Sequence, residues 1–317
     1  MGLGGPPMVT VLLCPGQGAQ KVGMGKDLAD RYPAARECFD RIDEALGVAL
    51  TRIMWEGPEG DLTQTHNTQP AILAHTAAVW AVVRDRLGGS AAVALGHSLG
   101  EYSAYVTAGA LTPEQAAQLV RRRGELMHEA GTRRPGSMAA VLGLATEQVL
   151  EACREASSAT EVVVGANLNA PDQTVISGDP PAVERAGQGC KAAGAKRVVP
   201  LKVSGAFHSP LMAPAVPGLE EAITAAPFEE PRVPVVANAT AEVVRTAARA
   251  RRLLVEQLTA PVRWVEGMRR AAELAPEATY VELGPGGVLS GLAKRVVPRA
   301  ATLPLGTADE LERFLCA

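Results

Sequence analysis

One stretch, residues 91–110, constrains the fold of this chain more than any other. An apolar run, residues 91–95, leads directly into Gly96-His97-Ser98-Leu99-Gly100, and helix-forming residues follow as far as Gly109. In a G-x-S-x-G pattern the serine lies on a sharp turn between a buried strand and a helix, and glycines flank it because side chains would clash there. Glycine and serine are common, so five residues alone also match by chance. The strand and helix on either side favour a nucleophile elbow that presents the Ser98 hydroxyl.

The composition favours a large α/β domain. Hydrophobic residues make up 47% of the 317 residues and aromatic residues only 3%, so Ala, Val and Leu must build the core, as in parallel sheets covered by helices. Strand-like runs alternate with helical patterns, which predicts such a sheet. The expected strands are residues 9–14, 91–95, 233–237 and 279–283; the expected helices are 27–46, 70–87, 112–130, 213–225, 247–258 and 265–274, with a loop at 57–69.

A different order of elements occupies the middle of the chain. Strand patterns at 137–142, 162–168, 173–177 and 197–203 enclose helical patterns at 146–156 and 181–193. This βαββαβ order is ferredoxin-like. We therefore expect an α/β-hydrolase-like large domain, formed by residues 1–134 and 206–317, with a small ferredoxin-like subdomain inserted at residues 135–205.

Charge and cysteine content exclude several classes of protein. The net charge of -3 gives no electrostatic basis for binding nucleic acid. The five cysteines are scattered without a C-x-x-C pair, which indicates reduced thiols in a cytoplasm and neither a disulfide framework nor a metal site. Residues 1–7 lack the basic and apolar regions of a signal peptide, and no segment predicts a membrane span. The glycine loop at 15–20 lacks the third glycine of a dinucleotide fingerprint, because Lys21 stands there.

Two further residues are candidates for chemistry. Thr112-Pro113-Glu114 predicts a helix start, and Arg123 falls within the apolar stripe of that helix. A buried arginine needs an anion, which is either a carboxylate of the protein, the commoner case, or a carboxylate of a substrate. His208 lies in a loop, residues 204–210, between a strand and the next helix, where catalytic groups often occur. A single histidine is nevertheless more often an ordinary core or surface residue.

Seven segments in order resemble the malonyl-CoA:acyl carrier protein transacylases of fatty acid synthesis and the acyltransferase domains of polyketide synthases. The resemblance covers nearly the whole chain, and the joint occurrence of the segments is far more specific than any one of them. The segments are residues 15–20 (PGQGAQ), 96–104 (GHSLGEYSA), 123–127 (RGELM), 167–171 (NLNAP), 173–178 (QTVISG), 206–212 (AFHSPLM) and 257–264 (QLTAPVRW).

The resemblance implies roles for individual residues. Ser98 would be the nucleophile and His208 the general base, which suits a weak hydroxyl nucleophile paired with an imidazole. Backbone N–H groups of Gln17 and Leu99 would stabilise the oxyanion, and a carbonyl near Gln257 would orient the histidine. No aspartate that would complete a triad is evident.

The same resemblance implies the cargo and the partners. Arg123 would bind the free carboxylate of a malonyl group, and Phe207 would keep the pocket too small for methylmalonyl. The reaction would be ping-pong, from malonyl-CoA to the phosphopantetheine thiol of holo acyl carrier protein, with no cofactor and no metal. We expect a monomer that binds neither nucleic acid nor membrane, and a basic patch for the acidic carrier from Arg133, Arg134, Lys191 and Lys196, although solvated surface charge is the commoner explanation of such residues.

Two other functions fit parts of the sequence. Trans-acting relatives hydrolyse acyl thioesters with the same elbow, but a hydrolase that clears neutral acyl chains has no use for Arg123. A catalytically silent docking module would not need Ser98 or His208, and both are present in their motifs. Whether the carrier belongs to fatty acid or polyketide synthesis does not follow from the sequence.

Overall fold

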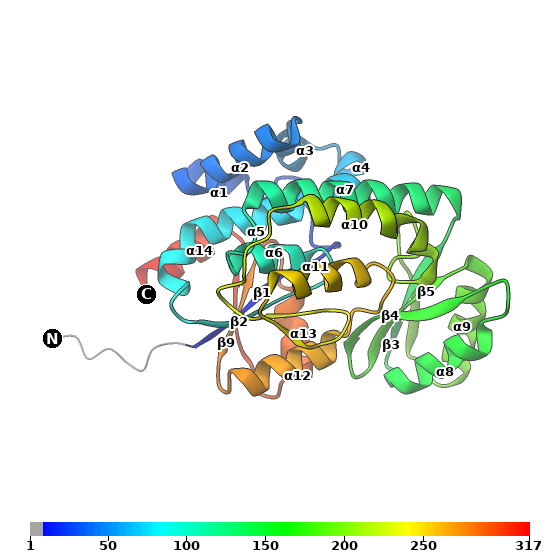
Figure 1. Cartoon of the computed structure of the whole chain (residues 1–317). Coiled ribbons are helices and arrows are strands. Elements are labelled where there is room, and N and C mark those ends of the chain that lie inside the picture. The colour runs from blue at the N-terminus through cyan, green and yellow to red at the C-terminus, as the bar shows by residue number, and fades with distance from the viewer. Residues whose placement is uncertain (1–8) are drawn as a thin grey trace.

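The computed structural model describes residues 9–317. The prediction that residues 1–7 are an irregular start and not a signal peptide therefore lies outside the described residues. The chain forms two sheets, a six-stranded sheet and a four-stranded sheet, each covered by helices (Figure 1). Within residues 9–317, no helix combines the length and apolarity needed to cross a bilayer.

The larger sheet has the strand order β10-β9-β1-β2-β7-β8. Its neighbours pair in parallel, except that β7 and β8 are antiparallel. Strands β8 and β10 are absent from the sequence expectation, because two residues of β8 show no periodicity and β10 contains a proline. The bounds are β1 Thr10–Cys14, β2 Ala91–Gly96, β7 Val235–Val236, β8 Val243–Val244, β9 Thr279–Leu283 and β10 Ala301–Leu305.

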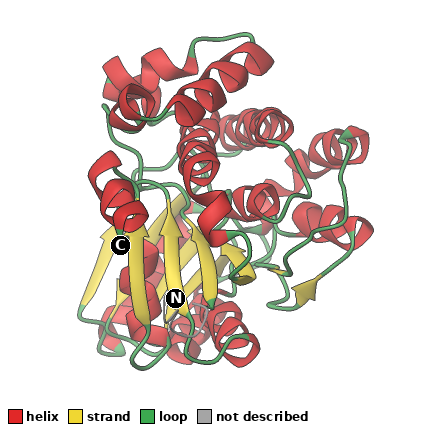
Figure 2. Ribbon diagram, turned by 90° about the vertical axis from the view of Figure 1, so that its left-hand side faces the viewer, coloured by secondary structure: helices red, strands yellow, loops and turns green. Residues whose placement is uncertain are grey.

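Helices cover both faces of this sheet (Figure 2). Alternate residues of β1 point to opposite faces, so Leu12 packs into one core cluster and Val11 and Leu13 into the other. The second cluster holds α12 (Trp264–Leu274) and α13 (Val288–Val296). The first holds the other helices of this domain: α1 Lys26–Arg31, α2 Pro33–Leu46, α3 Leu50–Glu56, α4 Glu59–Leu62, α5 Thr65–Leu87, α6 Gly100–Thr107, α7 Pro113–Arg133, α10 Val216–Ala225, α11 Ala247–Glu256 and α14 Ala308–Cys316, with a 3-10 helix at Pro210–Ala215.

Two expectations about these helices were wrong. The helix expected at 27–46 is broken at Tyr32, because Pro33 begins α2 at a position where its missing N–H costs nothing. The loop expected at 57–69 contains α4 and the start of α5. Its later polar residues, Thr65 and 67–69, are buried, and Asn67 donates to the carbonyl of Asp61, so their polarity does not indicate a solvated surface.

The smaller sheet has the order β4-β5-β3-β6 and is antiparallel throughout. With α8 and α9 packed together against it, this is the ferredoxin-like arrangement, and the predicted fold class is confirmed. The domain boundaries at 134/135 and 205/206 remain a prediction. The elements are β3 Ser137–Leu142, α8 Thr146–Ala156, β4 Val163–Ala170, β5 Gln173–Gly178, α9 Pro180–Ala192 and β6 Arg197–Pro200.

Candidate active site

The turn between β2 and α6 has the geometry of a nucleophile elbow. Ser98 adopts a left-handed backbone conformation with φ of 54°. A Cβ atom at Gly96 would lie 1.8 Å from the carbonyl oxygen of Gly100, and one at Gly100 would lie 2.2 Å from the carbonyl oxygen of Cys14. Real side chains never approach so closely, so both glycines are required. The strand, turn and helix expected from the sequence are all present.

The amide side chain of Asn238 stabilises this turn through two hydrogen bonds. Its Oδ1 accepts a hydrogen bond from the backbone N–H of Ser98 at 2.7 Å, and its Nδ2 donates to the carbonyl of Gly96 at 2.7 Å. Asn238 follows β7, the strand next to β2, so it lies at the same edge of the sheet. The sequence expectation missed this residue. Asn238 directly follows the expected strand at 233–237, and a polar residue at the end of a strand parallel to β2 is the signal that would have indicated it.

His208 contacts the serine directly. Its Nε2 lies 2.7 Å from Ser98 Oγ, and its Nδ1 lies 2.9 Å from the backbone carbonyl of Gln257. Since a carbonyl only accepts, these partners assign the proton to Nδ1, which leaves Nε2 to accept from the serine hydroxyl. Burial, and then the nearby guanidinium of Arg123, lower the pKa of His208 to about 3. The imidazole is therefore neutral at neutral pH and able to take a proton.

Arg123 is buried beside the same serine without a carboxylate partner. Only 1% of it is exposed, and it makes no ion pair with any residue in 9–317. Its Nη2 donates to Ser98 Oγ at 3.1 Å and to Gln257 Oε1 at 3.0 Å, and its Nη1 donates to Gln69 Oε1 at 2.8 Å. A buried charge with only neutral partners is costly unless an anion reaches it. No carboxylate within residues 9–317 forms an ion pair with Arg123, and Glu101 is connected to it only through the side chain of Gln257.

A hydrogen-bonded network lies behind these groups. The side chain of Gln257 donates from Nε2 to the carbonyl of Ser98 at 2.9 Å and to Glu101 Oε2 at 2.8 Å. The same carboxylate oxygen accepts from the backbone N–H of Asn238 at 3.1 Å. Glu101 is fully buried, and this burial raises its pKa to about 7. The sequence expectation gave Glu101 no role beyond its place in a motif.

A cavity of about 110 Å³ brings the predicted residues together. Gln257 does not line it but contacts Ser98, Arg123 and His208 from behind. The backbone N–H groups of Gln17 and Leu99 make no hydrogen bond to any residue in 9–317, so both remain available to a ligand. The lining comprises Gln17, Gln69, His97, Ser98, Leu99, Arg123, Met127, Met138, Asn167, Leu201, Val203, Phe207 and His208.

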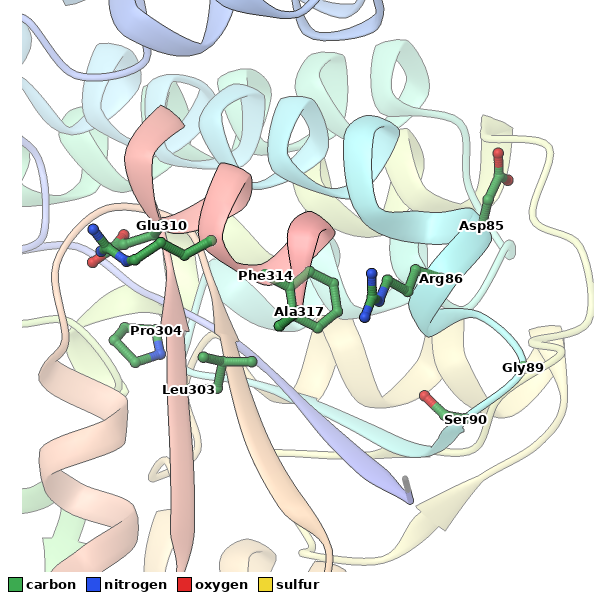
Figure 3. A pocket seen from close by; sticks show the side chains of 10 residues that line it. Asp85, Arg86, Gly89, Ser90, Leu303, Pro304, Glu310, Phe314 and Ala317 are labelled. Carbon is green, nitrogen blue, oxygen red and sulfur yellow. The ribbon is translucent and has the colours of Figure 1, made fainter. Parts of the chain in front are cut away.

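A larger cavity of about 800 Å³ lies elsewhere, between α14, the end of α5 and the edge strand β10 (Figure 3). Ser90 lines it and precedes β2, whereas Ser98 follows β2, so the two cavities lie at opposite ends of that strand. No histidine lines the larger one among the described residues. Its lining comprises Asp85, Arg86, Gly89, Ser90, Leu303, Pro304, Glu310, Arg313, Phe314 and Ala317, which offers no nucleophile with a base.

A metal site and a basic patch were the other features to look for. In the part of the chain that the structure describes, no three His, Cys, Asp or Glu residues are grouped to hold a metal ion. Arg134, one of the residues expected in a basic patch, is held by Asp179 at 2.8 and 2.9 Å. Lys191 and Lys196 are exposed.

Comparisons with known proteins agree on one family. Residues 11–304 match the acyl transferase domain family. The malonyl CoA-acyl carrier protein transacylase of Bacillus subtilis is 43% identical over 302 residues, which covers 95% of this chain and 94% of the relative. The malonyl CoA-acyl carrier protein transacylase of Coxiella burnetii, whose structure is solved, is 38% identical, with a TM-score of 0.92 and 98% of both chains covered. A malonyl-transacylase solved in complex with a type II polyketide synthase acyl-carrier protein is 40% identical, with a TM-score of 0.91, and 96% of this chain and 98% of that chain are covered.

Proposed function

The chain belongs to the acyl transferase domain family, and we propose that this member transfers the malonyl group of malonyl-CoA to the phosphopantetheine thiol of holo acyl carrier protein. One observation carries the choice of cargo. Arg123 is a buried guanidinium that no carboxylate of the described residues contacts, and its Nη2 lies 3.1 Å from the hydroxyl oxygen of Ser98. An acyl group on Ser98 that ends in a carboxylate supplies the missing anion.

The first half-reaction loads the enzyme. His208 Nε2 takes the proton of Ser98, and Oγ attacks the thioester carbonyl of malonyl-CoA. The N–H groups of Gln17 and Leu99 donate to the oxyanion that forms, and one such donor typically contributes about 3 kcal/mol. The tetrahedral intermediate collapses to a malonyl ester on Ser98. CoA leaves as a thiol with the proton that His208 held.

The second half-reaction reverses these steps with another thiol. The phosphopantetheine thiol of the carrier gives its proton to His208 and attacks the ester on Ser98. The new thioester leaves with the carrier, and His208 returns the proton to Ser98 Oγ. The enzyme thereby supplies extender units for fatty acid or polyketide synthesis, by a ping-pong mechanism in which the cargo is covalently held between partners.

Arg123 selects the cargo in this scheme. A planar guanidinium presents a fork of N–H donors that suits a carboxylate, and the pairing is stronger where water is excluded. Acetyl has no group to make this pairing. Phe207 closes another side of the 110 Å³ cavity, which we propose disfavours the extra methyl group of methylmalonyl.

We also propose that the enzyme has no resident cofactor, is a monomer and works in the cytoplasm. The reaction needs no resident cofactor, because CoA is a substrate and the pantetheine arm belongs to the carrier. We propose that the enzyme works as a monomer, which size-exclusion chromatography with light scattering would test. All five cysteines are unpaired thiols, which supports a reducing compartment such as the cytoplasm.

The experiment that tests the proposal compares Arg123→Ala with the wild-type enzyme. We expect transfer from malonyl-CoA to a holo carrier protein to lose about 2 kcal/mol, roughly 30-fold in rate, because a hydrogen bond to a charged group is lost. Transfer from acetyl-CoA should persist. Arg122→Ala, at the partly exposed neighbouring position, is the matched control and should change neither rate.

Three results would contradict the proposal. Equal losses with both substrates would make Arg123 a structural residue. Release of free malonate in place of malonyl-carrier would indicate a hydrolase. Carrier binding that is independent of Ser98 and His208, without transfer, would indicate a docking module.

A further inference from the structure

Two buried groups of opposite charge lie close to Ser98 without touching. Glu101 and Arg123 are both fully buried, and a single amide separates them: Gln257 donates from Nε2 to Glu101 Oε2 at 2.8 Å, and its Oε1 accepts from Arg123 Nη2 at 3.0 Å. The other carboxylate oxygen, Glu101 Oε1, has no hydrogen-bond partner among residues 9–317. It is therefore able to carry a proton without breaking a bond that the structure shows.

The charge balance of this region depends on the cargo. In the free enzyme, the positive charge of Arg123 and the negative charge of an ionised Glu101 balance each other, and their attraction is strong because the buried region has a low dielectric constant. A carboxylate bound to Arg123 adds a second negative charge, and Arg123 is the one fully buried Lys or Arg side chain among residues 9–317. The other ionisable groups that face Glu101 are Tyr102 and Tyr105 of its own helix, and burial raises the pKa of both phenols and keeps them neutral.

The groups that the neighbouring elements present are neutral as well. Asn238 after β7 and Gln257 after α11 are amides, and His208 is a neutral imidazole. Of these groups, the carboxyl of Glu101 is the one that can change its charge near neutral pH, since burial raises its pKa to about 7. A second anion in the same desolvated region raises that pKa further.

We propose that binding of the malonyl carboxylate at Arg123 is coupled to uptake of a proton by Glu101. The inference rests on the proposed function. Glu101 is thus a positioning residue whose proton compensates the charge of a cargo with a free carboxylate, whereas binding of an uncharged acyl group such as acetyl is coupled to no proton uptake. The enzyme consequently prefers malonyl over acetyl more strongly as the pH falls towards 7, the pKa of Glu101 in the free enzyme, and the preference levels off below that pH.

Calorimetric titration of the Ser98→Ala enzyme tests this coupling, because the thioester remains intact. Malonyl-CoA and acetyl-CoA are each titrated near pH 8 in two buffers that differ in ionisation enthalpy. The CoA moiety is common to both ligands, so its own protons cancel. We expect malonyl-CoA to take up more protons than acetyl-CoA, by close to one. Above pH 7 its Kd should rise, relative to that of acetyl-CoA, by up to about tenfold per pH unit.

The neutral variant Glu101→Gln, placed in the same Ser98→Ala background, assigns the proton. It mimics protonated Glu101 in shape, so the extra proton uptake should vanish and the relative Kd should no longer change with pH. Glu220→Gln, at an exposed position on α10, is the control and should leave the coupling intact.

The outcomes separate this inference from the function it rests on. Equal proton uptake with both thioesters overturns the coupling, and this result needs no variant of Glu101. Extra uptake that persists in Glu101→Gln overturns the assignment to Glu101. Failure of malonyl-CoA to bind, together with no malonyl transfer by the wild-type enzyme, contradicts the proposed function itself.

Discussion

A backbone carbonyl, and not a carboxylate, orients the ring of His208. The carbonyl of Gln257 accepts from Nδ1 at 2.9 Å, and the charged neighbour of the ring is the cation of Arg123. In a Ser-His-Asp triad the carboxylate stabilises the imidazolium that forms during the reaction. Burial first, and then the cation of Arg123, disfavour the imidazolium here, and in the mechanism that we propose a carboxylate of the cargo offsets the second of these effects. The arrangement therefore links the strength of the base to the identity of the substrate.

The lowered pKa of His208 predicts an unusual pH profile. A protonated imidazole cannot accept the serine proton, so activity that depends on His208 falls only below its pKa, which lies at about 3 instead of near 6.5. Acylation of Ser98 by an uncharged ester avoids any contribution from a cargo carboxylate. We expect its rate constant to stay level from pH 7.5 to pH 5, measured by stopped-flow release of a chromophoric alcohol. A midpoint near 6.5 that persists in Glu101→Gln, which removes the carboxyl with a pKa of about 7, would show an imidazole with an ordinary pKa.

Replacement of Asn238 should destabilise the turn that holds Ser98. Asn238→Ala leaves the N–H of Ser98 and the carbonyl of Gly96 without partners in a buried turn, and each unsatisfied group typically costs about 1–3 kcal/mol. We expect a lower free energy of unfolding in urea and a lower kcat. Asn238→Asp keeps the acceptor for Ser98 but loses the donor to Gly96, so it should fall between. Wild-type stability of the alanine variant would contradict this role.

Local patterns predicted some of these residues and not others. Ser98 lies in a motif five residues long, and the burial of Arg123 follows from the period of its helix. Asn238, 140 residues away from Ser98 in the chain, was not predicted, and Gln257, 159 residues away, was predicted only through the family resemblance. No local pattern carries that information, because the parallel sheet brings these segments together only after folding.

Among the elements, α7 is central because it carries Arg123 to the site. It spans Pro113–Arg133 and packs along α5. Its predicted start is confirmed in detail: Thr112 accepts from the N–H of Gln115, and the Gln115 side chain accepts from the N–H of Thr112. This capping box satisfies two donors that the helix itself cannot satisfy.

Removal of this cap should lower stability and spare catalysis. Thr112→Ala is expected to cost about 1 kcal/mol in the free energy of unfolding, because an N-terminal donor loses its partner. Malonyl transfer at 25 °C should stay close to wild type, since the cap lies far along the helix from Arg123. Thr132→Ala, at an exposed position of the same helix, is the control. Equal unfolding curves for the two variants would refute the contribution of the cap.

Strong periodic patterns located most elements, whereas breaks and short elements were missed. Proline at 33 divides one helical pattern into α1 and α2, and buried polar residues after Leu62 hide the start of α5. The expected helices at 112–130 and 265–274 differ from α7 and α12 by only a few residues. Edge strands such as β8 escape prediction because their pairing, and not their sequence, makes them strands.

In the molecule as a whole, residues that follow strands of the larger sheet and residues of the smaller sheet, such as Met138 and Asn167, line the same cavity. Ser98, Gln17 and Asn238 follow the carboxyl ends of β2, β1 and β7. The chain that returns from the smaller sheet brings His208, and β4 of that sheet bonds to Val262, with Leu168 N–H donating to its carbonyl at 2.9 Å. The βαββαβ order predicted the smaller sheet correctly, but its contact with the larger one depends on packing between distant segments.

The central claim is that the cargo is held as an ester on Ser98 between two thiols. Intact-protein and peptide mass spectrometry after brief exposure to malonyl-CoA tests it most directly. The account predicts one added malonyl group on the peptide that contains Ser98, its loss on addition of holo carrier protein, and no adduct in Ser98→Ala. An adduct on another residue, such as the exposed thiol of Cys316, or malonyl transfer by Ser98→Ala, would contradict it.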